Sequence, residues 1–116
     1  MIASDGGLSY LHPSGAGAFP RVLGPMVRDE KSIKLETAIR KMTAMPAARL
    51  GLKERGVLQK GAAADILVFD PARIQDRATV QNPSAPAEGV KYVFVNGIMV
   101  VSEGQPTADR PGTPLR

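Results

Sequence analysis

The sequence predicts an α+β protein in which helices come first and a small antiparallel sheet follows. Two observations carry this prediction. Apolar residues recur with helical spacing over residues 35–42, whereas residues 90–101 contain two β-rich runs on either side of Asn96-Gly97. The periodicity changes from helical to strand-like after Gly56, and such segregation of helices from strands is typical of the α+β class. A length of 116 residues is enough for one domain.

Residues 5–20 are predicted to form a long loop. Glycine and proline recur from Gly6 to Pro20, and His12 lies between them. Loops of this length without structure of their own are usually functional or disordered. We expect a helix to start at Pro20, because proline suits the first helical position. Pro25 should kink that helix or restart it, since its ring removes a helical hydrogen bond.

The clearest predicted helix covers residues 34–44. Its apolar residues fall at i, i+3, i+4 and i+7 and form one stripe: Leu35, Ala38, Ile39 and Met42. We expect this helix to end near Thr43, because the residue before Pro46 is disfavoured in the helical region. A second short helix should run from Pro46 through Leu50, with Gly51 as its left-handed cap.

Strand-like runs follow. A short strand is possible at residues 57–58, and a strand at 66–69 is apolar throughout, which predicts cover on both of its faces. The Asn-Gly dipeptide within 90–101 is a strong hairpin signal, because both turn residues must take positive φ. We therefore expect a small antiparallel β-unit over 56–103, packed by the helix at 35–44, because an isolated hairpin is only marginally stable.

Composition limits the classes of function. The chain has no cysteine, which excludes disulfides and thiolate metal sites, and only one histidine. It carries a net charge of +4, but basic and acidic residues alternate along the chain, so we expect no nucleic-acid partner. A basic nucleic-acid-binding protein remains the third alternative. No run approaches the roughly 20 apolar residues of a membrane span, and no signal peptide is evident, so we expect no membrane partner and a cytoplasmic location.

Two residues near the N-terminus are candidates for chemistry. Asp5 follows a short apolar stub and precedes Gly6-Gly7, an arrangement that suits a catalytic carboxylate at the mouth of a barrel. An aspartate in an ordinary turn is the alternative. His12 lies in the loop just before Pro13, where a histidine is more often solvated or structural than catalytic.

Several longer stretches resemble one family. They are SDGG at 4–7, HP at 12–13, GAFPRVLG at 17–24, LETAIRKMTAMPAARLGL at 35–52, RGVLQKGAAADILVFDP at 55–71, DRAT at 76–79 and GVKYVFVNGIMVV at 89–101. Together they resemble the C-terminal part of the N-acyl-D-amino-acid deacylases, or D-aminoacylases, of the metal-dependent amidohydrolase superfamily.

The resemblance implies a division of the chain. Residues 1–31 would be the remnant of the last strand of a (β/α)8 barrel with its active-site loop, and residues 32–55 a helical segment. Residues 56–103 would be part of a small β-sandwich domain, and residues 104–116 an extended tail. The implied activity is zinc-dependent hydrolysis of the amide C–N bond of N-acyl-D-amino acids. The zinc would be held by the complete enzyme, and we expect none to be held by this chain alone.

The resemblance also implies residue roles. Asp5 matches the family's catalytic aspartate, which takes a proton from metal-bound water and passes it to the leaving nitrogen. Asp5 would also touch the metal in a complete enzyme. Gly6, His12 and Ser14 would contribute to substrate binding. Members often have an arginine where this chain has Ser14, so recognition of the substrate carboxylate by that arginine is not transferred.

One alternative to an enzyme segment is a non-catalytic module. Such a truncated or interaction module would form homo-oligomers through exposed apolar surface, or would associate with a separate barrel chain.

Overall fold

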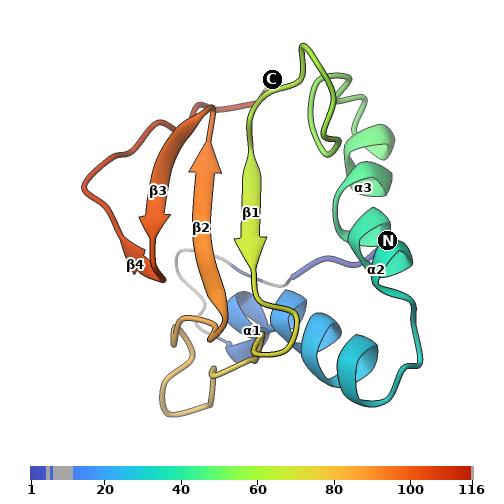
Figure 1. The fold of residues 1–116 in the computed structure, drawn as a ribbon, viewed down its shortest axis with the longest axis vertical. Coiled ribbons are helices and arrows are strands. Elements are labelled where there is room, and N and C mark those ends of the chain that lie inside the picture. The colour runs from blue at the N-terminus through green and yellow to red at the C-terminus, as the bar shows by residue number, and fades with distance from the viewer. Residues whose placement is uncertain (5, 7–11, 116) are drawn as a thin grey trace.

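The computed structural model describes residues 1–4, 6 and 12–115, and the predictions that fall on residues 5 and 7–11 lie outside this description. The helical half of the chain lies beside and below a four-stranded sheet (Figure 1). The α+β class is confirmed. The elements in chain order are α1 Pro13–Arg21, η1 Val22–Asp29, α2 Leu35–Met42, α3 Ala44–Arg49, β1 Ile66–Phe69, β2 Val90–Val95, β3 Ile98–Ser102 and β4 Gln105–Pro106.

The helix α1 begins at Pro13, so the predicted loop over 5–20 is wrong from residue 13 onward. His12 is the N-cap residue, and its side chain accepts a hydrogen bond from the backbone N–H of Ser14. Pro13 occupies the first turn, where its missing N–H costs nothing. The prediction chose Pro20 for this role, but Pro20 lies inside α1.

The helix neither ends nor restarts at Pro25. It continues from α1 into η1, a segment with the wider π-helical winding that begins at Val22. Pro25 has no N–H to donate to the carbonyl of Arg21, and its ring would clash with that carbonyl in an α-helix. The wider winding accommodates the proline, so the distortion appears three residues earlier than the expected kink.

Helices α2 and α3 lie where the sequence predicted them, with bounds that differ by one or two residues at each end. Helix α2 ends at Met42 with Thr43 as its C-cap, as expected. Helix α3 begins at Ala44, two residues before the expected Pro46. Its end is closed by hydrogen bonds from the N–H of Gly51 to the carbonyl of Ala48 and from Leu52 to Ala47, and Gly51 has φ +73°. This is the Schellman arrangement that the glycine predicted.

The sheet is an antiparallel meander in the order β1-β2-β3-β4. Its central hairpin turns at Asn96 with φ 50° and Gly97 with φ 81°, which confirms the prediction from the Asn-Gly dipeptide. The short strand β4 pairs with the end of β3, in a region for which the sequence predicted an extended tail. Residues 57 and 58 belong to no strand, and Leu58 is 82% exposed.

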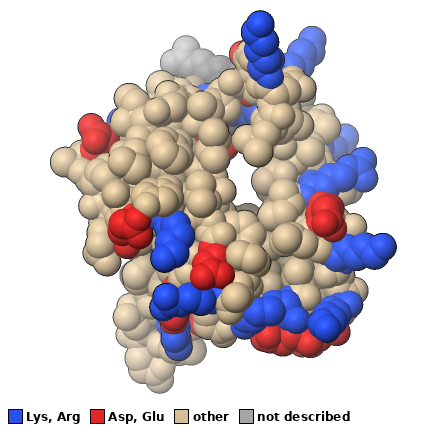
Figure 2. Space-filling model, viewed as in Figure 1, with Lys and Arg blue, Asp and Glu red and all other residues tan. Residues whose placement is uncertain are grey.

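The strand β1 is less covered than its sequence predicted. Leu67 and Val68 are 48% and 42% exposed, so the expectation of cover on both faces is wrong in this chain. Helix α2 does not close directly on the sheet either. A groove of about 390 Å³ separates them, lined on the helical side by Ile39 and on the sheet side by Ile66, Leu67 and Phe69. Figure 2 shows the molecule hollowed between the sheet and the helices.

A large, fully buried side chain links the two halves. Ile74, in the connection between β1 and β2, is 1% exposed, and Val22 and Leu23 of η1 are buried as well. In the ribbon view this connection lies beside α1, below the sheet (Figure 1). In the described part of the chain, no helix is long and apolar enough to cross a membrane.

Candidate functional site

Three of the predicted site residues lie at the N-terminal end of α1. The ring Nδ1 of His12 lies 2.8 Å from Oγ of Ser14 and accepts the N–H of Ser14 at 3.2 Å. The N–H of Gly15 donates to the carbonyl of His12 at 2.9 Å. The first-turn N–H groups of Ser14 and Gly15 are thus satisfied by His12 itself, which makes His12 the cap of this helix.

Gly6 lies against the same helical turn. A Cβ on Gly15 would lie 3.2 Å from Cα of Gly6, so the two backbones approach closely enough to favour glycine at position 15. Before Gly6, the N–H of Ile2 donates to the carbonyl of Lys41 at the end of α2, at 2.9 Å. The segment that enters the site is therefore held at both ends, by α2 and by α1.

Asp5, the predicted catalytic residue, lies outside the described residues. Its role and the substrate-binding roles of Gly6, His12 and Ser14 stay predictions. The structure does bring Gly6, His12 and Ser14 together, although no regular spacing in the sequence required it.

The donor groups among the described residues do not form a zinc site by themselves. Zinc sites in proteins use three or four ligands from cysteine, histidine and carboxylate side chains. Within residues 1–4, 6 and 12–115, no group of three or more such side chains could hold a metal ion. We therefore derive no reaction step through a metal on these residues.

The connection between β1 and β2 docks on the helix that follows the site. Arg21 of α1 donates to Oδ2 of Asp76 from Nε at 3.1 Å and from Nη2 at 2.6 Å. Farther along the helix, Arg28 donates to the carbonyl of Ile74 at 2.6 Å and to the side chain of Gln75 at 3.0 Å. The sequence analysis missed these contacts, because the partners are 46 to 55 residues apart. Arg21 lies in the stretch GAFPRVLG and Asp76 in the stretch DRAT, but nothing in the sequence indicates that these two stretches are in contact.

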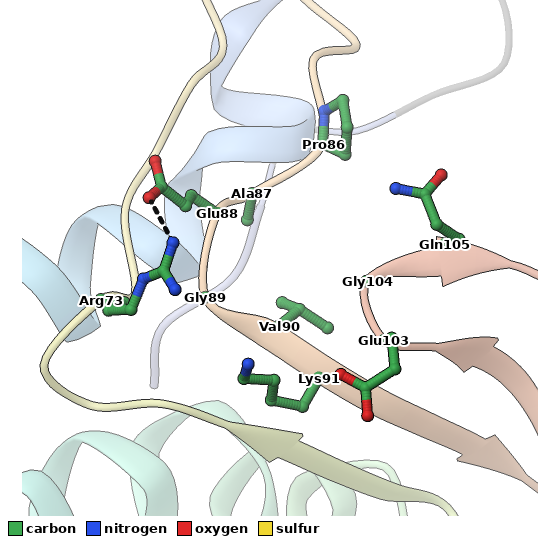
Figure 3. A pocket seen from close by; sticks show the side chains of 10 residues that line it. All are labelled: Arg73, Pro86, Ala87, Glu88, Gly89, Val90, Lys91, Glu103, Gly104 and Gln105. Atoms are coloured by element: carbon green, nitrogen blue, oxygen red, sulfur yellow. Dashed lines mark hydrogen bonds and ion pairs between the residues drawn. The ribbon is translucent and has the colours of Figure 1, made fainter.

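A second set of charged residues forms ion pairs within the same connection. Glu88 pairs with Arg77 and with Arg73, and Arg77 first and Arg73 second hold the pKa of its carboxyl below the usual range. Glu88 and Arg73 line a hollow of about 350 Å³ with Lys91 and Glu103 (Figure 3). Two acids and two bases face this hollow, so its charges balance, and it shows no preference for an anion or a cation.

Charge is mixed over the face seen in Figure 2. Lys and Arg gather along the margins of the helical side, and Asp and Glu lie among them. The mixture contrasts with the clustered basic patches of nucleic-acid-binding surfaces.

The α+β fold, with its capped helix docked on a strand connection, has counterparts among known hydrolases. A model of the amidohydrolase family matches residues 2–101, and the chain belongs to this family. The recognition of the family from the sequence is confirmed.

Two relatives come from Alcaligenes xylosoxydans xylosoxydans. The chain is 48% identical over 118 residues to a D-aminoacylase, a match that covers 99% of the chain and 24% of the relative. It is 44% identical over 118 residues to an N-acyl-D-glutamate deacylase, covering 100% of the chain and 24% of the relative. The chain thus spans about a quarter of the length of these enzymes.

A solved structure has the same fold over this segment. It is the N-acyl-D-glutamate deacylase of Bordetella bronchiseptica, in complex with zinc and a phosphonate inhibitor that mimics the tetrahedral intermediate of the reaction. Its TM-score is 0.82 at 50% identity, and the match covers 90% of this chain and 22% of that one. A crystal structure of a D-aminoacylase matches with a TM-score of 0.80 at 47% identity, over 84% of this chain and 21% of that one.

Proposed function

We propose that this chain works as the C-terminal segment of a zinc-dependent deacylase that hydrolyses the amide bond of N-acyl-D-amino acids. The observation that carries the proposal is the match to a D-aminoacylase across 99% of the chain, at 48% identity. The likeness in fold to a zinc-bound N-acyl-D-glutamate deacylase supports it. In this proposal, residues 1–4 continue from the last strand of a (β/α)8 barrel, and the sheet is part of a β-sandwich.

The segment supplies a carboxylate base and the loop that carries it. Asp5 accepts a proton from the attacking water and returns it to the leaving nitrogen, a role that suits a carboxylate held beside the reacting atoms. Zinc, held in the complete enzyme mainly by residues from outside this chain, would make water a stronger acid. The histidine-capped start of α1 holds the far end of the loop, because His12 and Ser14 bond to each other there.

Ser14 bears on the choice of substrate. A carboxylate is held best by the two parallel N–H groups of an arginine, and a serine hydroxyl cannot reproduce that geometry. Since Ser14 is already bonded to His12, we propose that it orders the loop, and that any grip on the substrate's carboxylate comes from residues elsewhere in a complete enzyme.

The second candidate is a non-catalytic module that binds another polypeptide. The specific observation in its favour is the groove between α2 and β1, with the exposed Leu58 and Leu67 along it. The two candidates differ in one respect. A deacylase segment confers activity on a barrel that lacks this part, and a mere interaction module does not.

A chimera tests the proposal. The matching segment of the Alcaligenes D-aminoacylase is replaced by residues 1–116, and hydrolysis of N-acetyl-D-amino acids is measured with zinc present. We expect turnover that falls by about 100-fold or more in the Asp5→Asn chimera, because a positioned general base contributes roughly 10²–10⁴-fold.

The matched control is Asp109→Asn, which removes an exposed aspartate in the C-terminal part of the chain. This chimera should keep its activity. A folded, zinc-loaded chimera without turnover would contradict the proposal, and so would an Asp5→Asn chimera that turns over normally.

A further inference from the structure

The carboxylate of Asp76 is nearly buried in the contact between α1 and the β1–β2 connection. Its side chain is 6% exposed, whereas that of its partner Arg21 is 62% exposed. Oδ2 accepts both hydrogen bonds from Arg21, and Oδ1 accepts the backbone N–H of Ala78 at 2.8 Å. Both oxygens of Asp76 are therefore engaged, one with the helix and one with its own turn.

The helix leaves room for this carboxylate at Gly17. A Cβ built on Gly17 would lie 2.6 Å from Cγ of Asp76, closer than real Cβ contacts allow. Asp76 cannot move aside easily, because Arg21 and Ala78 hold it from two directions. Any side chain at Gly17 would push α1 away from the connection.

The same arrangement recurs two helical turns later. A Cβ on Gly24 would lie 2.8 Å from the carbonyl oxygen of Ile74, and Arg28 donates to that carbonyl. Glycine and arginine thus occur at positions 17 and 21 and again at 24 and 28, four residues apart each time. Residues four apart lie on one face of a helix. In each pair, the glycine lets the segment that contains Ile74 and Asp76 approach the helix closely, and the arginine donates hydrogen bonds to that segment.

The contact of Gly17 and Arg21 with Asp76 lies close to the candidate site. Helix α1 is only nine residues long, its N-cap is His12, and Gly17 lies at its middle. A short helix moves as a rigid unit, because its backbone hydrogen bonds fix the rise at about 1.5 Å per residue. A shift of α1 at Gly17 therefore displaces His12, Ser14 and the close contact between Gly15 and Gly6.

We propose that Asp76 is a positioning residue that fixes α1 and, through it, the loop that ends at His12. This inference rests on the proposed function where it concerns catalysis. Asp76 does not touch the reacting atoms. Asp76 instead fixes the position of the loop, and the loop positions the catalytic group against the reacting atoms. A misplacement of that group by about 1 Å can cost roughly 100-fold in rate.

The only histidine of the chain provides a direct measurement. In the 116-residue chain labelled with ¹⁵N, the ring signals of His12 arise from a single residue. We expect Asp76→Asn to shift these signals and to make the amide hydrogens of α1 exchange about fivefold faster or more, because the charge that strengthens both hydrogen bonds from Arg21 is lost. The matched control is Glu88→Gln, which breaks two ion pairs in the same connection without touching α1. It should leave the His12 signals in place.

Two further variants keep the test decisive. Arg21→Lys preserves the charge but loses the paired N–H groups, and Gly17→Ala removes no charge at all. Both variants should shift the His12 signals in the same direction as Asp76→Asn. If Asp76→Asn does not fold, these two variants test the proposal in its place. Unshifted His12 signals in folded Asp76→Asn, Arg21→Lys or Gly17→Ala would overturn the proposal, as would an equal shift in Glu88→Gln.

The chimera with the Alcaligenes barrel measures the catalytic consequence. We expect Asp76→Asn to lower kcat by about 10- to 100-fold while KM changes less than about threefold, because the loop is misplaced and the substrate pocket of the barrel is intact. A fall in apparent kcat that merely follows the fraction of folded protein would overturn the positioning role. An inactive unsubstituted chimera would instead contradict the proposed function, and the His12 signals would still decide whether Asp76 positions α1.

Discussion

Oδ1 of Asp65 accepts a hydrogen bond from the backbone N–H of Asn96, 31 residues farther along the chain, at 2.9 Å. Arg55 ties the two residues together, since it pairs with Asp65 and donates to Oδ1 of Asn96 at 3.0 Å. The side-chain amide of Asn96 in turn donates to the carbonyl of Pro111. The hairpin turn is therefore bound to the start of β1, to the helical side and to the C-terminal segment at once.

This contact predicts a dependence of stability on pH. The N–H of Asn96 first, and then Arg55, hold the pKa of the Asp65 carboxyl below its usual range. A carboxyl with a lowered folded-state pKa adds stability that is present above its unfolded value of about 3.9 and is lost as the pH falls through the folded-state value. We expect Asp65→Asn to remove this part of the acid dependence and to lower the free energy of unfolding at pH 7 by about 1 kcal/mol or less, because about a third of the side chain is exposed.

Urea denaturation between pH 2.5 and 7 measures this effect. Asp109→Asn is the control, because it removes an exposed aspartate that is not part of the turn. An Asp65→Asn chain with the same acid dependence as the unsubstituted chain would contradict the assignment.

The turn itself predicts the effect of a β-branched residue. Gly97 has φ 81°, a region that costs an L-residue roughly 1–2 kcal/mol and a β-branched one at least as much. We expect Gly97→Val to destabilise the chain by about this amount and to lower Tm in calorimetry. Gly112→Val is the matched control, since a Cβ there meets nothing within 4 Å and φ is not positive. Equal Tm values for the two variants would exclude the turn assignment.

The elements that the sequence predicted well are those with local causes. The Asn-Gly turn needs only positive φ at two adjacent residues, and α2 needs only its apolar stripe. The cap at Gly51 is equally local. Each depends on residues within a few positions of one another, so the sequence alone contains the information.

The helix α1 was missed because its stabilisation is not local. Its sequence PSGAGAFPR contains two glycines and two prolines, which are poor helix formers. The structure shows why the glycine at position 17 is tolerated: it faces Asp76, and Arg21 binds the same carboxylate. The sequence contained one usable signal, because Pro13 follows a residue able to cap the helix.

The candidate site was predictable only in part. The sequence grouped Gly6, His12 and Ser14 in one loop, and the structure brings them to one helical turn. It could not indicate Asp76, which lies 55 residues from Arg21 along the chain. The apolar run at β1 predicted cover on both faces of the strand, but among the described residues Leu67 and Val68 stay 48% and 42% exposed.

That uncovered surface predicts association. The groove between α2 and β1 presents apolar side chains to solvent, and β1 is an edge strand of the sheet. Exposed apolar patches and open edges promote self-association. We expect the purified chain to bind a hydrophobic dye and to sediment above the monomer mass, and we expect Leu67→Lys to reduce both effects.

Val80→Lys is the control for the groove. Val80 is 80% exposed, more than Leu67, but it lies in the β1–β2 connection and not along the groove. It should leave dye binding and sedimentation unchanged. A monodisperse monomer without dye binding at high concentration would contradict the expectation, and so would equal effects of the two lysine variants.

The final prediction concerns the chemistry of the chain on its own. We expect the purified 116-residue chain, supplied with zinc, to show no hydrolysis of N-acetyl-D-amino acids above the buffer rate. A general base accelerates a reaction only when the water and the substrate are held beside it, and its contribution is then about 10²–10⁴-fold. Asp5 provides the base, but the described residues contain no group of ligands that could hold a metal ion and its water.

The decisive comparison uses three proteins in one zinc-supplemented assay: the chain, its Asp5→Asn variant and the chimera with the Alcaligenes barrel. If the segment supplies only the base and its loop, the first two give the same background rate and the chimera turns over. Robust hydrolysis by the chain that disappears in Asp5→Asn would show that these 116 residues build a complete site, and the division of labour between segment and barrel would then be wrong.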